Sequence, residues 1–475
     1  MSLVGELARI CLRPASRDDR ERAALHVAAW TGAAALGAAT PLAAALRRGY
    51  GPPGGIAPGA GDGWSGLLLE ASLGCMHELD DFHREALVHP GPVVIPAALH
   101  VARRTAASGA ATLLAIVRGY EAMIRMGESV GPRHYEQWHN TSSCGAAGAA
   151  VAAASLLGLD AARSADALAL AVTQPSGLWQ IRLDPCDAKP WSMARASQTG
   201  VQAALLAQAG IRGPARALEG EKGFYTATCP DPRPERIGAD PTAPWKIHQT
   251  TFKPWAACRH AHPAIDAALA LRDAWRERDG WRALPAADIA AIRVNTYGDA
   301  IAFCDRARPA TPHEARFSLQ HAVAVALNKG WPEAGDFSES AIADTAHARV
   351  RALVRAAPCE HCSARYPRHF GATVTVVLKN GRELRHQVHD ALGDPERPMA
   401  PGQVLDLARL LMTSAGWTPQ RARRRMEAIL SLEMLPRLGG DDFSPVPSAR
   451  RRRRGSIGRS LRTSGAGGRS GPHLG

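Results

Sequence analysis

The stretch CGAAGAAVAAASLL, residues 144–157, is built almost entirely of small side chains. Alanine is the strongest helix former, and the stretch has no charged residue that would give a helix a polar face. An isolated helix of this kind is only marginally stable in water. The residues before it, Asn140–Ser143, supply several side chains that favour the N-cap position. The stretch therefore predicts a helix that is stable only when it is buried against other helices.

Helical patterns also surround this stretch. Residues 196–209 form a second small-residue segment, and Asp18–Leu46 has the composition of helix. A Gly/Pro-rich loop at residues 48–62, RGYGPPGGIAPGAGD, separates the latter from the helical pattern that resumes near Trp64. The pattern continues, with breaks, to about Gly210. The first half of the chain therefore reads as a helical domain that ends in a loop-rich region, residues 210–254.

The pattern changes after Trp281. Residues 291–297 alternate as a β-strand does, and residues 373–388 read as strand, Asn-Gly turn and returning strand. A helical segment, residues 318–329, lies between these strands in the sequence. This part of the chain is therefore predicted to be an α+β unit, which a helix beginning at Pro263 precedes.

The predicted fold class is mostly α, with a large all-helical domain and a smaller α+β lid domain inserted before a C-terminal helical return. Residues 1–254 form the helical domain and 255–400 the lid. Residues 401–438 return to the first domain as helix. Residues 439–475 are predicted to be a disordered basic tail.

The composition describes a globular body, with 46% hydrophobic and 21% charged residues in 475. The formal net charge is +13, and the eight arginines between Arg450 and Arg469 carry over half of this excess. A nucleic-acid-associated basic protein is thus an alternative class. Nucleic-acid binding is nevertheless expected only non-specifically, through the Arg450–Arg469 tail, because the body is only mildly positive.

The expected location is the cytoplasm. The nine cysteines are an odd number at wide spacing, which does not resemble a disulfide framework. No signal peptide is visible at the N-terminus. Residues 27–46 are uncharged and long enough to span a membrane, but they are mostly Ala and Gly with Thr40-Pro41 inside. They are interpreted as a buried helix, a turn and a second helix, and no membrane contact is expected.

The stretch MHELDDFHREALVHPG, residues 76–91, gathers four carboxylates and three histidines. It can be a solvated helix face, a metal site or half of an acid/base site. A metalloprotease motif would need a second histidine where Asp81 stands. His77, Asp81 and Glu85 share one face if the stretch is a helix, but this spacing matches no familiar metal site. No metal is therefore expected.

Basic and imidazole groups precede several alanine-rich helices. His139 stands directly before the segment 144–157, Lys189 before 196–209, and Lys253 and Arg259 before the helix at Pro263. Anions are held well at helix N-termini and by charge-assisted hydrogen bonds. These positions are therefore candidate sites for a polycarboxylate.

Five stretches together resemble the MmgE/PrpD family, which includes 2-methylcitrate dehydratase, cis-aconitate decarboxylase and iminodisuccinate epimerase. The resemblance runs in order from about residue 20 to 435. The stretches that carry it are ELDDFHREALVHPGPVVIPAAL (78–99), WHNTSSCGAAGAAVAAASLLGLD (138–160), DAKPWSMARASQTGVQAALLAQAGIRGP (187–214), KPWAACRHAHPAIDAAL (253–269) and EARFSLQHAVAVAL (314–327).

The resemblance implies a homodimer, a site between the two domains, and no metal or organic cofactor. Carried over position by position, the family's site residues fall on Glu78, Asp80, Asp81, His89, His139, Lys189, Lys253 and His321. Three of the family's positions differ here. Glu78 replaces an aspartate, Phe82 stands where the decarboxylase has a threonine, and His321 replaces a tyrosine. These differences argue against a cis-aconitate decarboxylase and weaken the match to 2-methylcitrate dehydratase.

The resulting hypothesis is a cofactor-independent acid/base enzyme that acts next to a carboxylate of a small di- or tricarboxylic acid, with a 2-methylcitrate dehydratase-like lyase as the leading form. Glu78, Asp80, His89 and His139 are the predicted catalytic residues, with His139 as the main base or acid. Lys189, Lys253, Arg259 and His321 are predicted to bind the substrate. The alternatives are an epimerase, an isomerase or a decarboxylase of the same family, or a carboxylate-binding descendant without activity.

Overall fold

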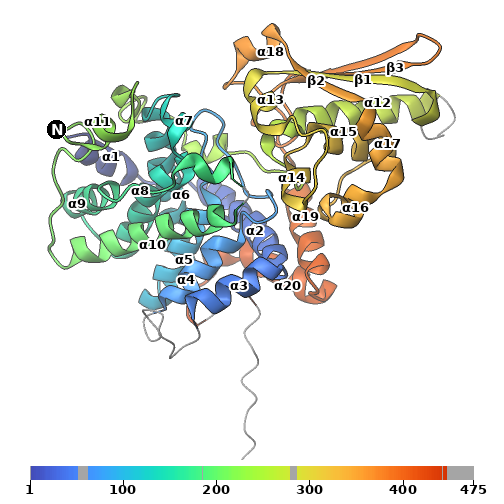
Figure 1. The fold of residues 1–475 in the computed structure, drawn as a ribbon. Helices are drawn as coiled ribbons and strands as arrows, with labels where there is room; N and C mark the ends of the chain where they lie inside the picture. Colours follow the sequence, from blue (N-terminus) through green and yellow to red (C-terminus); the bar gives the residue numbers. More distant parts are fainter. Residues whose placement is uncertain (1, 52–62, 185, 279–285, 441, 447–475) are drawn as a thin grey trace, which may run out of the picture.

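The computed structural model describes residues 2–51, 63–184, 186–278, 286–440 and 442–446. These residues form a large helical domain and a smaller α+β domain beside it (Figure 1). The fold class predicted from the sequence is confirmed. The predicted Arg450–Arg469 tail lies outside the described residues.

The helical domain is arranged around α8 (Asn140–Leu156), which contains the small-residue stretch. Helices α5, α6, α9 and α10 pack directly against it. The helices of this domain are α1 (Leu3–Cys11), α2 (Arg17–Ala38), α3 (Pro41–Tyr50), α4 (Trp64–Leu73), α5 (Gly91–Thr105), α6 (Gly109–Ser129), α7 (His134–Gln137), α9 (Ala161–Val172), α10 (Ala188–Gln208) and α11 (Phe224–Thr228). Every residue of α8 from Asn140 to Ala154 is buried, as the absence of a polar face predicts.

Small residues let these helices approach closely. A Cβ atom built on Gly200 of α10 would lie 2.5 Å from the carbonyl oxygen of Ala146, and one on Gly148 would lie 2.7 Å from that of Gly119. A larger side chain at either position would push two helix backbones apart. The alanine and glycine content of the sequence therefore sets the spacing of the central helices.

The smaller domain contains a four-stranded mixed sheet in the order β2-β1-β3-β4. The predicted strand and hairpin are confirmed as β1 (Ile289–Thr296), β3 (Ala372–Leu378) and β4 (Glu383–Val388), with Gly381 at positive φ in the turn. β2 (Val354–Pro358) pairs with β1 in parallel, and the other pairs are antiparallel. Helices α12 (His262–Arg278) and α15 (Leu319–Asn328) cover one face of the sheet (Figure 1). The shorter helices of this domain are α13 (Gly298–Cys304), α14 (Pro312–Arg316), α16 (Glu339–Ala343), α17 (Thr345–Leu353) and α18 (Glu360–Arg365).

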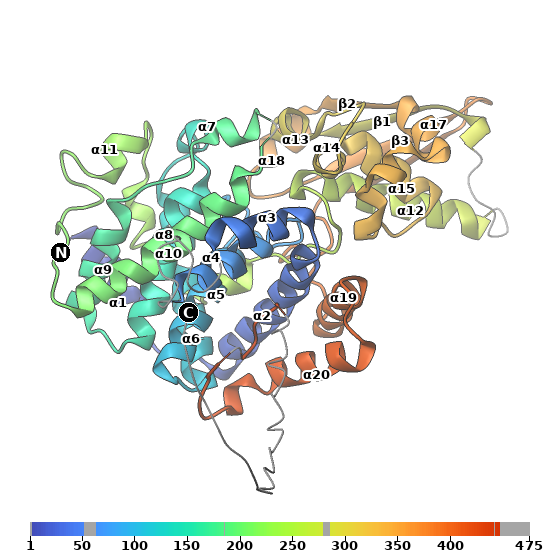
Figure 2. The same cartoon turned by 60° about the horizontal axis from the view of Figure 1, so that its bottom comes forward.

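The chain then returns to the helical domain. Helices α19 (Pro401–Ser414) and α20 (Pro419–Leu430) lie beside α2 (Figure 2). Residues 442–446, which were predicted to belong to the tail, also pack on this domain: the Phe443 side chain is buried in its core, and Arg103 Nε donates to the Asp442 carbonyl at 2.7 Å. The packed chain therefore extends further than the predicted boundary at residue 439.

Helices α2 and α3 account for the uncharged run at residues 27–46. They meet at an angle of 89° beside Thr40, so the interpretation as helix, turn and helix is confirmed. In the part of the chain that the structure describes, no single helix is both long and apolar enough to cross a membrane, and this bent pair alone meets the criterion by length and composition.

Candidate active site

The stretch at residues 76–90 is not a helix. Between α4 and α5 it runs through turns held by isolated bridges, one of which joins Phe82 to Thr251. Glu78 adopts a positive φ of 55°, which a regular helix does not allow. Glu78, Asp80, Asp81 and His83 are all buried. The interpretation as a solvated helix face is therefore wrong.

Asp81 fixes this irregular segment to the surrounding helices. Its Oδ2 atom accepts a hydrogen bond from the Tyr120 hydroxyl at 2.6 Å and lies 2.7 Å from His26 Nδ1. Its Oδ1 atom accepts from the backbone N–H of Gly91, the first residue of α5, at 2.8 Å. One buried carboxylate thus joins three helices, which holds the neighbouring Asp80 in place.

The same segment orients His89. Its Nδ1 atom lies 2.8 Å from the carbonyl oxygen of Asp81 and 2.9 Å from Asp80 Oδ2. A carbonyl oxygen can only accept, so Nδ1 carries the proton. The other ring nitrogen, Nε2, is therefore the one that can exchange a proton with a bound molecule.

The potential metal ligands of the stretch do not converge. His77 Nδ1 accepts from Arg316 at 3.0 Å, Asp81 is engaged as described above, and Glu85 is exposed. Among the described residues, one other trio, His369, Asp390 and Glu396, has the spacing of a cation site. The Arg84 guanidinium already donates to Asp390 at 3.0 Å and to Glu396 at 2.6 Å, so a positive group occupies that position.

Two carboxylates and two lysines form a buried ionic cluster. Lys189, in the first turn of α10, forms an ion pair with Glu78. Lys253 Nζ lies 3.2 Å from Asp80 Oδ1 and 3.5 Å from Glu78 Oε2. The cluster contains equal numbers of positive and negative groups, which lowers the cost of burying them.

This pairing governs the protonation of the cluster. Burial alone would raise the pKa of Glu78, but Lys189 and Lys253 outweigh it and lower that pKa to about 2. Burial would lower the pKa of Lys189, and the Glu78 and Asp80 carboxylates outweigh it and raise that pKa. Glu78 is therefore ionised and Lys189 is a permanent cation at neutral pH.

His139 is the N-cap residue of α8 and is almost completely buried. Its Nδ1 atom pairs with Ser142 Oγ at 2.9 Å, which in turn receives a hydrogen bond from Ser192. Burial first, and then the charge of Lys189, hold the pKa of His139 well below its usual value of 6.5. The imidazole is therefore neutral at pH 7, and Nε2 is its ring nitrogen that remains open to a ligand.

A glycine brings an aromatic ring against this histidine. Gly177 has a φ of 90°, and a Cβ atom there would lie 2.4 Å from Ser142 Cβ. The carbonyl oxygen of Gly177 accepts a hydrogen bond from the backbone N–H of His139 at 2.8 Å. The short 3-10 helix that comes next, Trp179–Arg182, places Trp179 parallel to the His139 ring, with centroids 4.7 Å apart and planes at 15°.

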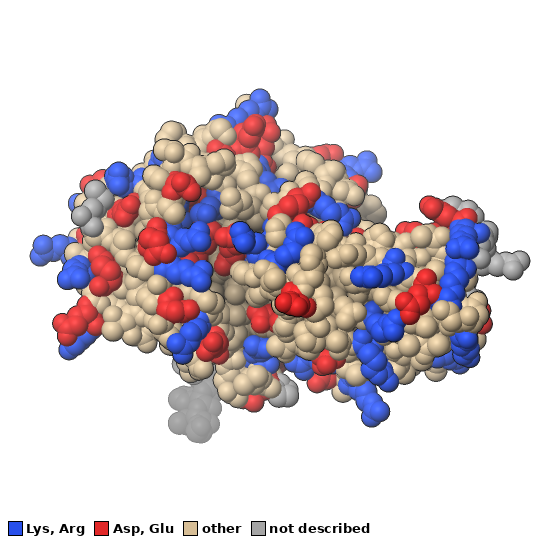
Figure 3. Space-filling model, turned by 90° about the horizontal axis from the view of Figure 1, so that it is seen from above, with Lys and Arg blue, Asp and Glu red and all other residues tan. Residues whose placement is uncertain are grey.

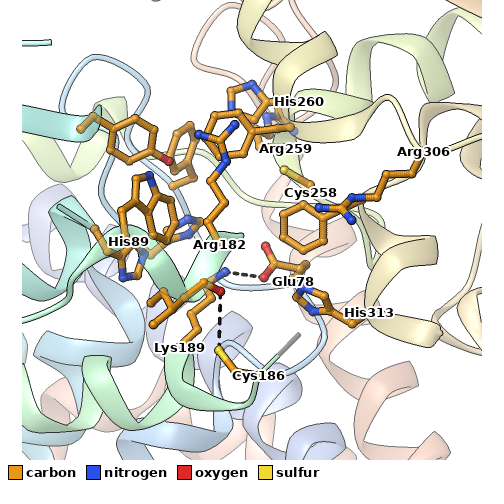
Figure 4. Close-up of a pocket in the computed structure, with 17 residues that line it drawn as sticks. Glu78, His89, Arg182, Cys186, Lys189, Cys258, Arg259, His260, Arg306 and His313 are labelled. Atoms are coloured by element: carbon orange, nitrogen blue, oxygen red, sulfur yellow. Dashed lines mark hydrogen bonds and ion pairs between the residues drawn. The ribbon is translucent and has the colours of Figure 1, made fainter. Parts of the chain in front are cut away.

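These groups surround a pocket between the helical domain and the lid (Figure 4). The helical domain contributes both charged and aromatic side chains, and the lid adds further basic and aromatic ones. The lining residues are Glu78, Phe82, His89, Tyr135, His139, Trp179, Ile181, Arg182, Cys186, Lys189, Cys258, Arg259, His260, Phe303, Arg306, His313 and Phe317.

Seven of the eight residues singled out from the sequence lie at or next to this pocket. Glu78, His89, His139, Lys189 and Arg259 line it, and Asp80 and Lys253 lie directly behind Glu78 and His89. The Arg259 guanidinium is already paired, at 2.7 Å from Asp394, and it also donates to two lid carbonyls. Its role as a free carboxylate clamp therefore receives no support from this geometry.

The structure does not bring His321 to the pocket. Its side chain is enclosed within the lid, where Nε2 lies 2.8 Å from the Asp336 carbonyl and Nδ1 accepts from Arg351 at 3.2 Å. His313 and Phe317, just before it in the chain, line the pocket instead. These two residues were not singled out from the sequence, and neither were Trp179, Arg182 and Arg306. Ser318 caps α15 at the backbone N–H of His321, which turns that side chain into the lid core.

Comparison with known proteins identifies the family of this chain. Residues 7–237 match the MmgE/PrpD N-terminal domain, and residues 255–433 match the MmgE/PrpD C-terminal domain. The chain is 26% identical to the cis-aconitate decarboxylase-like protein oryM of Aspergillus oryzae over 77% of its own length and 79% of that protein. It is 26% identical to human cis-aconitate decarboxylase, over 68% and 67% of the two chains. It is 28% identical to cis-aconitate decarboxylase of Aspergillus terreus over 42% and 44%. With both domain matches covering most of its length, the chain belongs to the MmgE/PrpD family.

Proposed function

We propose that this protein is an acid/base enzyme, a lyase that moves a proton on a carbon next to a carboxylate of a small carboxylic acid. The observation that carries the proposal is a neutral, buried imidazole, His139, next to a pocket that also contains the permanent cation Lys189. Removing a proton beside a carboxylate builds negative charge on the substrate. A neutral base and a fixed positive charge are the groups that lower the barrier to this step.

Each residue of the site has a separate role. His139 Nε2 takes the proton from the carbon, and the Lys189 ammonium stabilises the negative charge that develops. His89 enters the step as the imidazolium, with its Nδ1–H donated to the Asp81 carbonyl and beside the Asp80 carboxylate. It gives its Nε2 proton to the leaving hydroxyl group, which departs as water while the carbon–carbon double bond forms, and is left neutral. Glu78 and Asp80 keep Lys189 charged and hold both lysines in position.

We favour dehydration, the reaction type of 2-methylcitrate dehydratase, without taking 2-methylcitrate itself as the substrate. Dehydration begins with a base, the role that the neutral imidazole of His139 fills, whereas after loss of CO₂ the carbon would have to be protonated by another group, such as His89. The second candidate is decarboxylation, because the relatives described above are named cis-aconitate decarboxylases. Epimerisation shares the first proton transfer with dehydration, but the carbon is then protonated again from its other side and no group leaves.

Incubation of the purified protein with a panel of acids in deuterated water tests the proposal. The panel contains citrate, 2-methylcitrate, cis-aconitate, malate-type acids and aminodicarboxylic acids, each with and without a chelator, and mass spectrometry reads the products. Reversible dehydration is expected to place deuterium at the carbon next to a carboxylate in the hydroxy acid recovered from the reaction and in the hydroxy acid formed from cis-aconitate. This uptake is expected with the chelator present and is expected to be absent in His139→Ala. Product mass separates loss of water, loss of CO₂ and epimerisation. Exchange that is unaffected by His139→Ala would overturn the assignment.

A homodimer in the cytoplasm, without metal or cofactor, completes the proposal. Light scattering at several protein concentrations measures the oligomeric state. Binding to nucleic acid is not part of the proposed function. On the face shown in Figure 3, Lys and Arg side chains are interspersed with Asp and Glu. Salt-sensitive nucleic-acid binding by a chain truncated near residue 446 would contradict this view.

A further inference from the structure

One wall of the pocket is aromatic. Tyr135, Trp179 and Phe303 form a connected group, with ring centroids 5.4 Å apart for the first two and 5.9 Å apart for Tyr135 and Phe303. Phe303 belongs to the lid, so this wall crosses from one domain to the other. Trp179 Nε1 is buried without a hydrogen-bond partner among the described residues. The wall adjoins the proposed base directly, because Trp179 stacks on His139.

The polar side of the pocket has little positive charge to spare. The charges of Lys189 and Lys253 are balanced by Glu78 and Asp80, and Asp394 balances Arg259. His260 is neutral, because burial and nearby cations lower its pKa to about 3. A ligand with three carboxylates would therefore bring more negative charge than the inner pocket neutralises.

Of the three arginines that line the pocket, Arg182 and Arg306 differ from Arg259 in their partners. The guanidinium carbon of Arg182, in the helical domain, lies 3.6 Å from the centroid of the Phe303 ring, and Arg182 donates to the Ala302 carbonyl at 3.2 Å. The nearest carboxylate recorded for Arg306 of the lid is Glu314, at 3.9 Å, and Arg306 Nε is buried without a partner among the described residues. Figure 4 shows both side chains extending to the pocket from opposite domains. These guanidinium groups can accept one or two carboxylates in a bidentate manner.

We propose that the substrate is a mono- or dicarboxylic acid with a planar apolar substituent, which packs against the wall formed by Tyr135, Trp179 and Phe303 while Arg182 and Arg306 hold its carboxylates. This inference rests on the proposed function for the reaction, but it concerns binding alone. An aromatic or unsaturated group gains apolar contact and ring stacking from the wall. A third carboxylate would have to lie against these rings without a partner, and that arrangement is unfavourable. We therefore expect citrate-like acids, which carry three carboxylates, to bind less tightly than mono- or dicarboxylic acids with such a substituent.

Isothermal titration calorimetry with the full chain and three acids that cannot be dehydrated tests the inference. The acids are succinate, phenylsuccinate and tricarballylate. Phenylsuccinate is expected to bind about tenfold more tightly than succinate, the ratio that one favourable ring contact provides. Tricarballylate is expected to bind more weakly than phenylsuccinate. Equal affinities, tighter binding of tricarballylate, or no binding of any of the three would overturn the inference.

Single-residue variants show which side chains cause the preference for phenylsuccinate over succinate. Trp179→Ala is expected to reduce the advantage of phenylsuccinate over succinate to about twofold or less, since the ring contact is lost. Trp331→Ala is the matched control, because Trp331 is 46% exposed and lies in a different groove. Arg182→Gln is expected to weaken both dicarboxylates equally. Loss of the preference in the control variant, or its retention in Trp179→Ala with a folded protein by circular dichroism, would contradict the proposed wall.

These binding data are independent of turnover. If the phenylsuccinate preference is present but no acid of the expected class exchanges deuterium, the proposed reaction fails and the pocket inference stands. If exchange occurs with tricarboxylic acids and the preference is absent, the proposed reaction stands and the pocket inference fails.

Discussion

His139 stacks on Trp179, with ring centroids 4.7 Å apart and the two planes at 15°. The contact combines two effects. It removes water from the imidazole, which keeps it neutral, and it aligns the ring with an apolar surface that can hold the rest of the substrate. The base and the substrate wall are thus parts of one structural unit, which begins at the N-terminus of α8.

The first prediction concerns pH. His139 must be neutral to act as a base, and burial holds its pKa well below 6.5. The rate is therefore expected to persist as the pH falls through 6.5 and to decline only at lower pH. A profile of kcat/KM between pH 4.5 and 8 measures this. An acidic limb centred at 6.5 or above, and abolished in a His139 variant, would contradict a desolvated base.

The second prediction concerns the buried ionic cluster. Lys253→Met leaves Asp80 and Glu78 with one cation fewer in a position from which water is excluded. Removing one partner from a buried ion pair costs ~3–5 kcal/mol of unfolding free energy. Urea denaturation measures the loss. The double variant Lys253→Met/Asp80→Asn should recover part of it, because the uncompensated carboxylate is gone; a double variant as unstable as the sum of both singles would argue against the pairing.

Stability at acidic pH provides a third prediction. Burial lowers the pKa of His26 from 6.5 to about 4, although Asp81 partly opposes this. The unfolded chain then binds more protons than the folded one between these values, so stability is lost as the pH falls from about 6.5 toward 4. The urea midpoint should therefore be lower at pH 5 than at pH 7.5. His26→Gln keeps a donor for Asp81 but does not titrate, and it should narrow that difference. If the urea midpoints at pH 5 and pH 7.5 differ as much in His26→Gln as in the wild-type protein, His26 does not contribute to the loss of stability at acidic pH.

The fourth prediction compares two glycines. Gly200→Ala places a Cβ atom 2.5 Å from the Ala146 carbonyl, so α8 and α10 must separate, at a cost of ~1–3 kcal/mol. Gly49→Ala in α3 meets no atom within 4 Å and should be neutral or stabilising by up to ~1 kcal/mol. Thermal unfolding of both variants measures the contrast. Similar stabilities would mean that the small-residue contact does not set the helix spacing.

The local features of the fold were predictable from the sequence. The small-residue helices and the Asn380-Gly381 hairpin depend on neighbours in the chain, so their patterns are readable without a structure. The conformation of residues 76–90 could not be predicted from the sequence, because it depends on contacts of Asp81 with α2, α5 and α6. Its charged side chains are buried by tertiary structure, whereas the same pattern on a helix would be exposed.

The candidate site was predictable only in part. Glu78, His89, His139 and Lys189 stood out by residue type and position, the family resemblance then implied that they are site residues, and all four line the pocket. The aromatic wall had no sequence signal, because Tyr135, Trp179 and Phe303 lie far apart in the chain. His321 was carried over by position. Its neighbourhood shows why position is insufficient: the nearby residues that line the pocket, His313 and Phe317, belong to α14 and its C-cap, whereas His321 lies in the first turn of α15 and bonds within the lid.

His321 and His313 therefore give a fifth prediction. His321→Gln should leave the affinity for a dicarboxylate unchanged within about twofold, because the side chain bonds only within the lid. His313→Ala removes a pocket-lining imidazole and should weaken binding. Calorimetric titration of a dicarboxylate into each variant shows which of the two histidines contributes to binding. A strong loss in His321→Gln alone would favour the assignment made from the sequence.

The most direct test of the account is deuterium incorporation by the wild-type protein and by His139→Ala. A neutral general base contributes ~10²–10⁴-fold to the rate, so the variant should lose exchange by that factor while it keeps its fold and ligand affinity. That result would establish His139 as the group that moves the proton. Exchange at the wild-type rate in a folded His139→Ala variant would contradict the central claim.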